Sequence, residues 1–343
     1  MQAALGGLIA IFVLGGGMES SHSGTAATSA RQQYGDPQVM KFKDGKSAAF
    51  SMQFDDSMET QADFAIPEMN KRGLVGTFFI NPATDRYGRR RQTWEVVCPE
   101  HGHELANHTL RHKGAADYQE ADREIGECAR HIWKLYPQKS RLRPFLSGGG
   151  TTWGISQAER GELMDKYYLF RAPRRTSISD ESQNNRPVVQ AREAMEKGQW
   201  GLVGFHGIGG QWISTSEKAF VEMLDFLVEN RDRLWTGTTG DVYRYTQQRD
   251  AVKKVSLTDV SEGSFRIAIE CDQDKVKTYG RPFAELYDMP LTVQVSVPPS
   301  WKQFVVKQMS REVKGEVVNV DGRPVARLDV RPNVEPAVVT AAD

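Results

Sequence analysis

The stretch that decides the fold is Ala48-Ala49-Phe50-Ser51-Met52-Gln53-Phe54-Asp55-Asp56. Its first seven residues are mostly apolar and predict a buried strand. Neighbouring residues on a strand point to opposite faces, so two aspartates at its end can take different tasks. One carboxylate with two imidazoles forms a metal-ligand set that leaves a coordination position open for water. The alternative interpretation of the pair is a pair of turn or helix-cap aspartates.

Short apolar runs alternate with amphipathic stretches from about Met40 to Gln248, which predicts a parallel sheet, open or closed into a barrel. Gly73 is expected at the C-cap of the first helix, and Ser216 at the N-cap of a later one. The expected strands are Ala48 to Phe54, Val75 to Ile80, Leu202 to Phe205 and Leu234 to Thr236, and the expected helices are Gln61 to Arg72, Asp117 to Tyr136, Ser216 to Asn230 and Gly240 to Gln248.

The pattern changes after Val252 to period-two alternation, which predicts antiparallel β-structure in a small sandwich. Two strands are expected around the Asp321-Gly322 turn. The segment after Arg331 is expected to be frayed. Trp301 and Phe304 are candidates for stacking on sugar, with core packing as the competing interpretation.

The charge of the chain is balanced, with 44 basic and 44 acidic residues among 343, which argues against a nucleic-acid partner. The three cysteines, Cys98, Cys128 and Cys271, lack metal-like spacing. We expect buried free thiols, with a Cys98–Cys128 disulfide as the alternative.

Residues 1–30 predict an N-terminal export segment or signal peptide. The uncharged run from Ala3 to Gly17 resembles the apolar region of such a peptide and is too short to span a bilayer comfortably. Ala27-Thr28-Ser29-Ala30 offers a cleavage site. No Lys or Arg precedes the run, so an anchor or an inaccurate start codon is the alternative. We expect a secreted, periplasmic or cell-surface protein without an integral membrane span in its mature chain.

Histidines supply the other candidate ligands and acids. His108 and His112 are spaced i, i+4, which places both on one face of a helical turn, close enough to share an ion. His206 follows the expected strand Leu202 to Phe205, at the strand end where α/β barrels carry catalytic residues. His101 and His103 lack the matching spacing and are interpreted as bystanders.

Arg141-Leu142-Arg143-Pro144-Phe145 leads into Leu146-Ser147-Gly148-Gly149-Gly150. An arginine before proline is held extended and can pair with a carboxylate. The glycine run lacks the spacing and the lysine of a phosphate loop. Its N–H groups are candidates for contacting a developing oxyanion.

Together these segments resemble the polysaccharide deacetylase family, the NodB-homology carbohydrate esterases of family 4. The resemblance covers about Ala48 to Tyr245. The matching motifs are Phe54-Asp55-Asp56, Asn107-His108-Thr109-Leu110-Arg111-His112, Arg143-Pro144-Phe145, Leu202-Val203-Gly204-Phe205-His206, and Trp235-Thr236-Gly237-Thr238 with Asp241-Val242-Tyr243. The resemblance implies an α/β fold, a distorted (β/α) barrel with fewer than eight full strands.

The resemblance also implies roles at the matched positions. Asp56, His108 and His112 would bind a divalent metal, usually zinc, with cobalt or manganese as alternatives. Asp55 would be the general base, and Arg143 would orient or tune it.

His206 would be the general acid, and backbone near Phe145 would help to hold the oxyanion. Two departures from the family pattern stand out. The third motif continues into the glycine-rich stretch instead of an aromatic-glycine turn. The aspartate that usually supports the general acid is not evident, with Asp165 and Asp180 as weakly placed candidates.

These features predict an export segment at 1–30, a catalytic NodB-like domain at 31–250 and a β-rich accessory domain at 251–343. The expected function is metal-dependent deacetylation of a polysaccharide or oligosaccharide, at N or O, with an acetylated glycan as the partner. The alternatives are an amidohydrolase acting on a small cyclic imide or ureide, and a catalytically inactive carbohydrate-binding protein. Neither the oligomeric state nor the particular glycan follows from the sequence.

Overall fold

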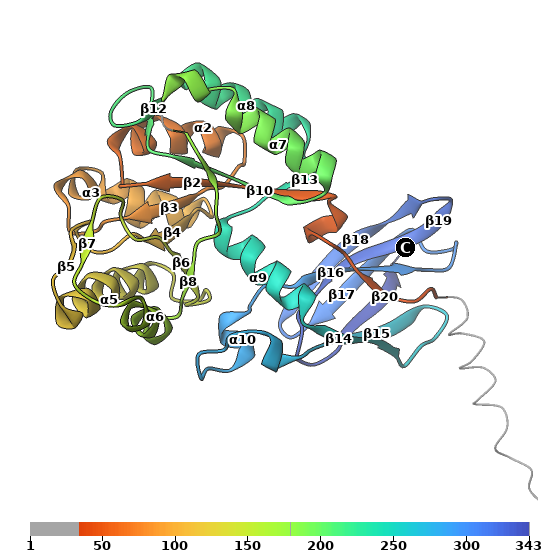
Figure 1. The fold of residues 1–343 in the computed structure, drawn as a ribbon. Helices are drawn as coiled ribbons and strands as arrows, with labels where there is room; N and C mark the ends of the chain where they lie inside the picture. The colour runs from red at the N-terminus through yellow and green to blue at the C-terminus, as the bar shows by residue number, and fades with distance from the viewer. Residues whose placement is uncertain (1–33, 179, 343) are drawn as a thin grey trace, which may run out of the picture.

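The computed structural model describes residues 34–178 and 180–342. It shows a parallel sheet surrounded by helices and a second, antiparallel sheet beyond it (Figure 1). The expected export segment, residues 1–30, lies outside the described residues. Within the described ranges, every helix is too short or too polar to cross a lipid bilayer.

Eight parallel strands form the first sheet, and the expected α/β class is confirmed. Their order is β8 (Leu169–Arg171), β6 (Arg143–Phe145), β4 (Glu104–Asn107), β3 (Thr77–Ile80), β2 (Ala48–Asp55), β10 (Trp200–Phe205) and β9 (Thr176–Ser177), with β13 (Leu234–Thr236) on β2. The path ends at β8 and β9, so the sheet is a distorted, open barrel. Strand β2 is central because both of its edges are paired. One edge pairs with β10, and the other pairs with β13 at the start of β2 and with β3 at its end.

Helices cover this sheet because each buries one apolar face against it. In α5, Ile125, Ala129 and Ile132 are buried, and Asp117 caps the helix by accepting from the Glu120 amide. The helices are η2 (Gln61–Ala65), α2 (Ile66–Lys71), α3 (Asp85–Arg89), η3 (Thr93–Val97), α4 (Cys98–Glu100), α5 (Tyr118–Leu135), α6 (Gln157–Lys166), η4 (Glu181–Gln183), α7 (Arg186–Lys197), α8 (Glu217–Glu229) and α9 (Thr239–Asp250).

Aromatic side chains fill the core beneath the carboxyl end of β2. Phe54 stacks on Phe78 of β3 and on Phe205 of β10, with ring centroids 4.7 Å and 5.3 Å away. Phe220 of α8 meets Phe54 edge-on. These rings are fully buried, and they fix the end of β2 against both neighbouring strands.

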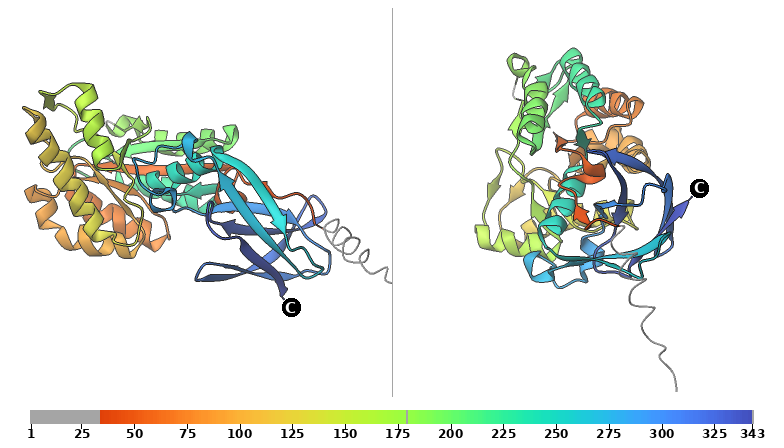
Figure 2. Two further views of the ribbon diagram at one scale, coloured as in Figure 1. Left: turned by 90° about the horizontal axis from the view of Figure 1, so that it is seen from below. Right: turned by 90° about the vertical axis from the view of Figure 1, so that its right-hand side faces the viewer.

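The second sheet is antiparallel throughout and curls around one core (Figure 2). Its order is β1 (Gln38–Val39), β16 (Leu291–Ser296), β19 (Arg323–Val330), β18 (Arg311–Val320), β17 (Gln303–Gln308), β20 (Ala337–Ala342), β15 (Ser264–Cys271) and β14 (Val252–Thr258). Strand β18 pairs with β17 through its first half and with β19 through its second. The expected sandwich is therefore built as one sheet that bends through β18.

Short elements complete the chain: η1 (Lys43–Gly45), η5 (Gln273–Lys275), α10 (Phe283–Leu286), and the strand pairs β5 (Gly114–Ala115) with β7 (Thr152–Trp153) and β11 (Gly207–Ile208) with β12 (Ser214–Thr215). The Asp321-Gly322 turn forms as expected, with both residues at positive φ. The expectation of a frayed end is wrong, because β20 lies between β15 and β17 and pairs with both.

Burial in the cores of the two sheets explains several aromatic and sulfur side chains. Trp301 and Phe304 are 4% and 2% exposed, so both serve core packing. Cys98, Cys128 and Cys271 are buried free thiols, as expected. Tyr34 packs on Phe265 and Trp301, and β1 pairs with β16, so the first described residues contact the second sheet. The division of the chain into domains at 250/251 stays a prediction.

Candidate active site

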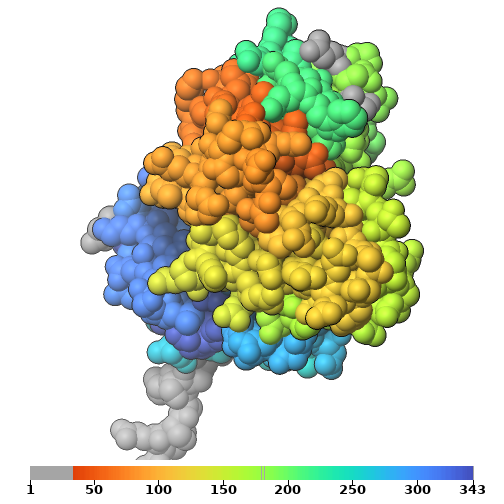
Figure 3. Space-filling view, turned by 90° about the vertical axis from the view of Figure 1, so that its left-hand side faces the viewer, coloured from red at the N-terminus to blue at the C-terminus, as the bar shows by residue number. Residues whose placement is uncertain are grey.

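The loops that follow the parallel strands lie on one side of the molecule, the side that faces the viewer in Figure 3. Strand β2 ends at Asp55, β4 ends just before His108, and β10 ends just before His206. Because the strands are parallel, their carboxyl ends meet at the same edge of the barrel. The chain reverses sharply after β2, since Asp56 and Ser57 have φ values of 72° and 50°. Aspartate tolerates this left-handed conformation better than most residues.

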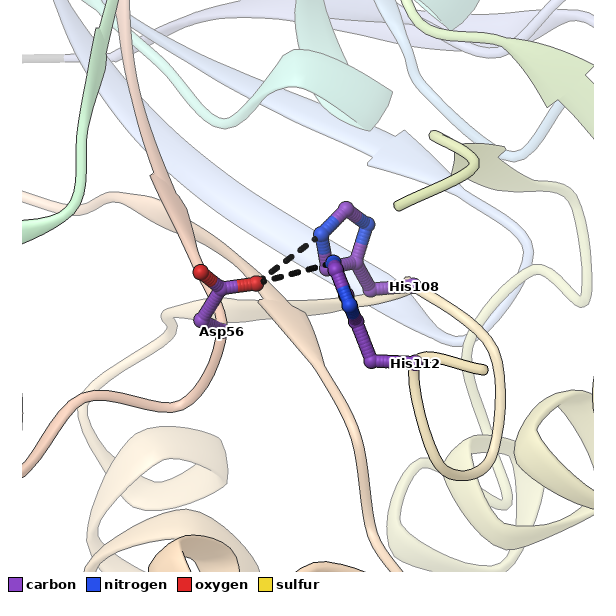
Figure 4. Close-up of side chains that lie close together, drawn as sticks. All are labelled: Asp56, His108 and His112. Carbon is purple, nitrogen blue, oxygen red and sulfur yellow. Dashed lines mark ion pairs between the residues drawn. The ribbon is translucent and has the colours of Figure 1, made fainter. Parts of the chain in front are cut away.

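Asp56, His108 and His112 converge on one point (Figure 4). The Nε2 atoms of His108 and His112 lie 3.2 Å and 3.3 Å from Asp56 Oδ1. Burial alone would raise the pKa of Asp56, but the close contact with the His108 ring and the charges of nearby imidazoles hold that pKa below its usual value. Among the described residues this is the one cluster of His, Cys, Asp or Glu able to hold a metal ion.

The two histidines meet through a loop, so the expected helical turn is wrong. Residues 108–113 form no helix, and Thr109 and His112 have φ values of 70° and 59°. The amide of His112 donates to Thr109 Oγ1 at 3.1 Å, which closes the turn. Asn107 Oδ1 accepts from the Thr109 amide, and Glu124 of α5 binds both the amide and the guanidinium of Arg111. The loop is thereby fixed to the barrel before any ligand binds.

Neighbouring backbone prepares both imidazoles as ligands. His108 Nδ1 lies 2.6 Å from the carbonyl oxygen of Leu146, which accepts the Nδ1 proton and leaves Nε2 with a free lone pair. Gly148 lies against the His112 ring, where a Cβ would stand 2.3 Å from Nε2. The glycine is therefore required for the position of His112. Two such imidazoles and one carboxylate form a donor set that fits zinc or a similar divalent ion.

Asp55 faces Arg175, a residue outside the motifs considered above. Arg175 Nη1 donates to Asp55 Oδ1 at 3.0 Å, and Nη2 bonds Oδ2, so the contact is bidentate. Arg175 Nη1 also donates to Gln53 Oε1 at 2.9 Å. The side chains of Arg175 and Asp55 are 10% and 5% exposed, so their geometry is held in a mostly buried setting. The arginine lies just before β9, which pairs with β10.

The prediction that Arg143 orients Asp55 is wrong. Arg143 Nη1 lies 3.4 Å from Glu104 Oε1, and its guanidinium lies over the ring of Tyr136. It starts β6, whereas the catalytic loops follow the strand ends. Burial raises the pKa of Glu104, opposed by the charges of Arg143 and Arg244. Arg143 therefore belongs to a buried ionic group beneath the barrel.

His206 faces both aspartates. Its Nε2 lies 3.7 Å from Asp55 Oδ2 and 3.9 Å from Asp56 Oδ2. Burial lowers the pKa of His206, with the two carboxylates opposing that effect. Among the described residues, no partner is found for its buried Nδ1 atom.

The two aspartates considered as supports for His206 make other contacts. Asp165 pairs with Lys277, and Asp180 accepts from the amide and hydroxyl of Ser182. Phe145 is buried, and its carbonyl oxygen accepts from the Ala172 amide within the strand pairing of β6 and β8.

Two amide side chains join the catalytic loops, and neither carried a sequence signal. Gln61 Nε2 donates to the carbonyl oxygens of Asp55 and His206 at 2.6 Å and 2.9 Å. Asn81, just after β3, donates from Nδ2 to the carbonyl oxygens of His108 and Thr109. These bonds set the spacing between the aspartates and the histidines.

Two hollows of about 440 Å³ each flank the site. We name the first the metal hollow; its lining includes Asp56, His112, Gly149 and Trp212. Trp212 is 66% exposed and offers an apolar face beside the ligand set. The second, the arginine hollow, includes Arg175 and Ser147 in its lining. Ser147 and Gly149 belong to the same glycine-rich stretch, so this stretch lines both hollows.

Comparison with known proteins agrees with this geometry. Residues 43–152 match the family model for polysaccharide deacetylase, and they include Asp55, Asp56, His108 and His112. This part of the chain belongs to the polysaccharide deacetylase family. The matched residues of the deacetylase domain cover β2 to β6 and continue into β7, so Arg175 and His206 lie outside the match.

Other similarities are more distant. The chain is 24% identical over 322 residues to a gellan lyase of a Bacillus species, and it covers 12% of that relative's length. A family 4 carbohydrate esterase from Streptomyces lividans in complex with acetate aligns over 56% of this chain and 93% of its own, with 17% identity and a TM-score of 0.41. A peptidoglycan deacetylase from Bacillus subtilis aligns over 60% and 94%, with 17% identity and a TM-score of 0.41.

Proposed function

We propose that this chain is a metal-dependent hydrolase that removes acetyl groups from a polysaccharide or oligosaccharide. The observation that carries the proposal is the meeting of Asp56, His108 and His112 within 4.8 Å of one another, with Asp55 and His206 beside them. A polysaccharide deacetylase match over residues 43–152 supports the same reaction class. Export of the protein stays an expectation that rests on residues 1–30.

Asp56, His108 and His112 would hold the divalent metal, for which zinc is the best candidate. When bound, such a metal supplies a Lewis acid that polarises an acetyl carbonyl and makes water more acidic. The hydrogen bond from His108 Nδ1 to the Leu146 carbonyl oxygen orients this ligand before the metal binds, because it directs the Nε2 lone pair to the ligand cluster.

Asp55 and His206 would move the protons. Asp55, whose two carboxylate oxygens each accept a hydrogen bond from Arg175, would take a proton from the attacking water as the general base. His206 would give a proton to the leaving amine or hydroxyl as the general acid. Its distance of 3.7 Å from Asp55 leaves the two groups separate but close enough to act on one tetrahedral centre. An oxyanion donor at Phe145 stays a prediction.

Trp212 supports a sugar as the substrate. An exposed indole beside a polar hollow stacks well on the apolar face of a sugar ring, which has hydroxyl groups at its rim. Trp212 is 66% exposed, which is high for so large an apolar side chain, so core packing does not explain its presence at this position.

The proposal is tested by acetate release from acetylated chitooligosaccharide, acetylated xylan and peptidoglycan fragments, with metal content measured in the same samples. Asp55→Asn and His206→Ala should each lower kcat by about 10²–10⁴-fold while metal binding is retained. Near-wild-type acetate release from either variant at full metal content would contradict the assigned roles. No release from any acetylated glycan by the metal-loaded wild type would contradict the function itself.

A further inference from the structure

The arginine hollow carries a charge that the deacetylation reaction does not use. Its lining includes Arg160, Arg171, Arg174 and Arg175, together with Phe145 and Met164. None of its lining residues is an aspartate or a glutamate. Four guanidinium groups therefore share a concave surface of about 440 Å³ without a carboxylate in its walls.

Only one of these four arginines has its charge balanced inside the protein. Arg175 reaches through to Asp55. Arg160 lies over the ring of Trp153, at 5.4 Å from its centroid, which leaves the positive charge in place. Within the described part of the chain, Arg160, Arg171 and Arg174 have no carboxylate within ion-pair distance.

Other arginines of this protein do have carboxylate partners. Arg90 binds Asp63 with two nitrogens, Arg281 binds Glu285, and Arg72 binds both Glu68 and Asp225. The whole chain is also neutral, with 44 basic and 44 acidic residues. The local feature, among the described residues, is that three arginines without a carboxylate partner line one hollow that has no acidic residue in its walls. A concave wall of one sign focuses the electric field and attracts the opposite charge.

The position of the hollow connects it to the reaction. Arg175 and Gln53 line it and both contact the Asp55 side of the site. Leu146, whose carbonyl oxygen orients His108, also lies in its wall. Gly149, three residues further along the same stretch, lines the metal hollow. The two hollows therefore have neighbouring residues of one loop in their walls, and both lie beside the catalytic groups.

We propose that the substrate is an acidic polysaccharide, with an anionic sugar bound in the arginine hollow beside the acetylated sugar at the metal ligands. This proposal rests on the deacetylase function and names its substrate class. Guanidinium groups bind carboxylates and sulfates through two parallel hydrogen bonds, so a uronic acid and a sulfated sugar share the required chemistry. Arg171 and Arg174 would bind the anion directly, since both are exposed at the hollow.

The test compares kcat/KM for acetate release from an O-acetylated polyuronate, from the same polymer after carboxyl reduction and re-acetylation, and from an acetylated sulfated glycan. We expect kcat/KM for an acidic polymer to be about tenfold higher than for the neutral one at low salt, because ion pairs at partly exposed sites contribute about that much to binding. The ratio of kcat/KM for the acidic polymer to that for the neutral one should fall as salt rises from about 0.05 to 0.5 M, because salt screens the attraction between arginine and the anionic sugar. Whichever acidic polymer is preferred identifies the anionic group.

The variant R171Q/R174Q should reduce the acidic-to-neutral ratio by about tenfold. The matched control R123Q/R323Q removes two exposed arginines outside both hollows and should keep the wild-type ratio. Equal kcat/KM for acidic and neutral polymers at low salt would overturn the proposal, as would the same loss of ratio in the control variant.

A binding measurement separates this proposal from the proposed function. Calorimetry with deacetylated uronate and sulfated oligosaccharides needs no turnover. If no acetylated glycan releases acetate, the function fails, while salt-sensitive binding that R171Q/R174Q weakens still supports the anion site. Absence of binding by the wild type to both acidic oligosaccharides would overturn the anion site.

Discussion

Gly204→Ala should slow the reaction without touching any reacting atom. A Cβ at Gly204 would lie 2.2 Å from Nε and 2.6 Å from Cδ of Arg175. Gly204 sits in the middle of the sheet, paired with Gln53 of β2 and Ser177 of β9, so its backbone is held on both sides. The arginine must therefore give way, and with it the bidentate contact to Asp55.

The size of the effect follows from the displacement. Ordinary contact begins at about 3.4 Å, so the guanidinium stem must move by roughly 1.2 Å. A misplacement of about 1 Å at a catalytic group can cost on the order of 10²-fold in rate. We expect kcat to fall by about that factor. Metal affinity should be retained, because Asp56, His108 and His112 do not contact Gly204.

The assay is a double-mutant cycle of acetate release with G204A, R175Q and the double variant, each checked for folding by thermal melting. If Gly204 acts only by leaving room for Arg175, G204A should have almost no further effect on kcat in the R175Q background. Full wild-type kcat in G204A would refute the reasoning. Equal losses from G204A with and without Arg175 would refute it as well.

Two further predictions separate structural charges from catalytic ones. Arg143→Leu should lower the free energy of unfolding by about 3 kcal/mol, because Glu104 stays buried without one of its cations, while kcat per folded molecule changes less than about twofold. Urea unfolding and activity on the same sample measure both quantities. A loss of kcat without a loss of stability would show instead that Arg143 acts in catalysis. His103 is buried between the Gly76 amide and Asn70, and burial lowers its pKa from 6.5 to about 4. Its contribution to stability is therefore complete above pH 6.5 and is lost as pH falls toward 4, by about 3 kcal/mol in total. Urea unfolding of wild type and His103→Asn at pH 7.5 and 4.5 measures this, and identical pH dependence in the two proteins would rule it out.

The sequence was most informative where local chemistry and periodicity agree. Strand β13 was predicted to the residue, and β2, α5 and α8 to within one or two residues, since apolar patterns and capping residues fix such elements locally. Asp55, Asp56, His108 and His112 were identified because each pair is close in sequence. The geometry of the histidine pair was wrong, since the positive φ values of Thr109 and His112 come from bonds to Asn107 and α5.

Arg175 was missed because its partner lies 120 positions earlier in the chain. It follows β8 in an irregular segment, and no spacing rule connects it to Asp55. The arginine-rich run Arg171 to Arg175 at a strand end was a usable signal, since strand ends carry the site in parallel barrels. The pairing of β20 depends likewise on distant partners, which is why its short alternating pattern was interpreted as a frayed end.

The central claim is that a divalent metal at Asp56, His108 and His112 drives acetate release, and titration of the metal-stripped protein with zinc tests it most directly. Acetate release from an acetylated glycan should rise linearly up to one equivalent of zinc per chain and then level off. The variants H108A and H112A should show no such breakpoint. Acetate release that is complete in the metal-stripped protein, or that has the same breakpoint in both variants, would contradict the account.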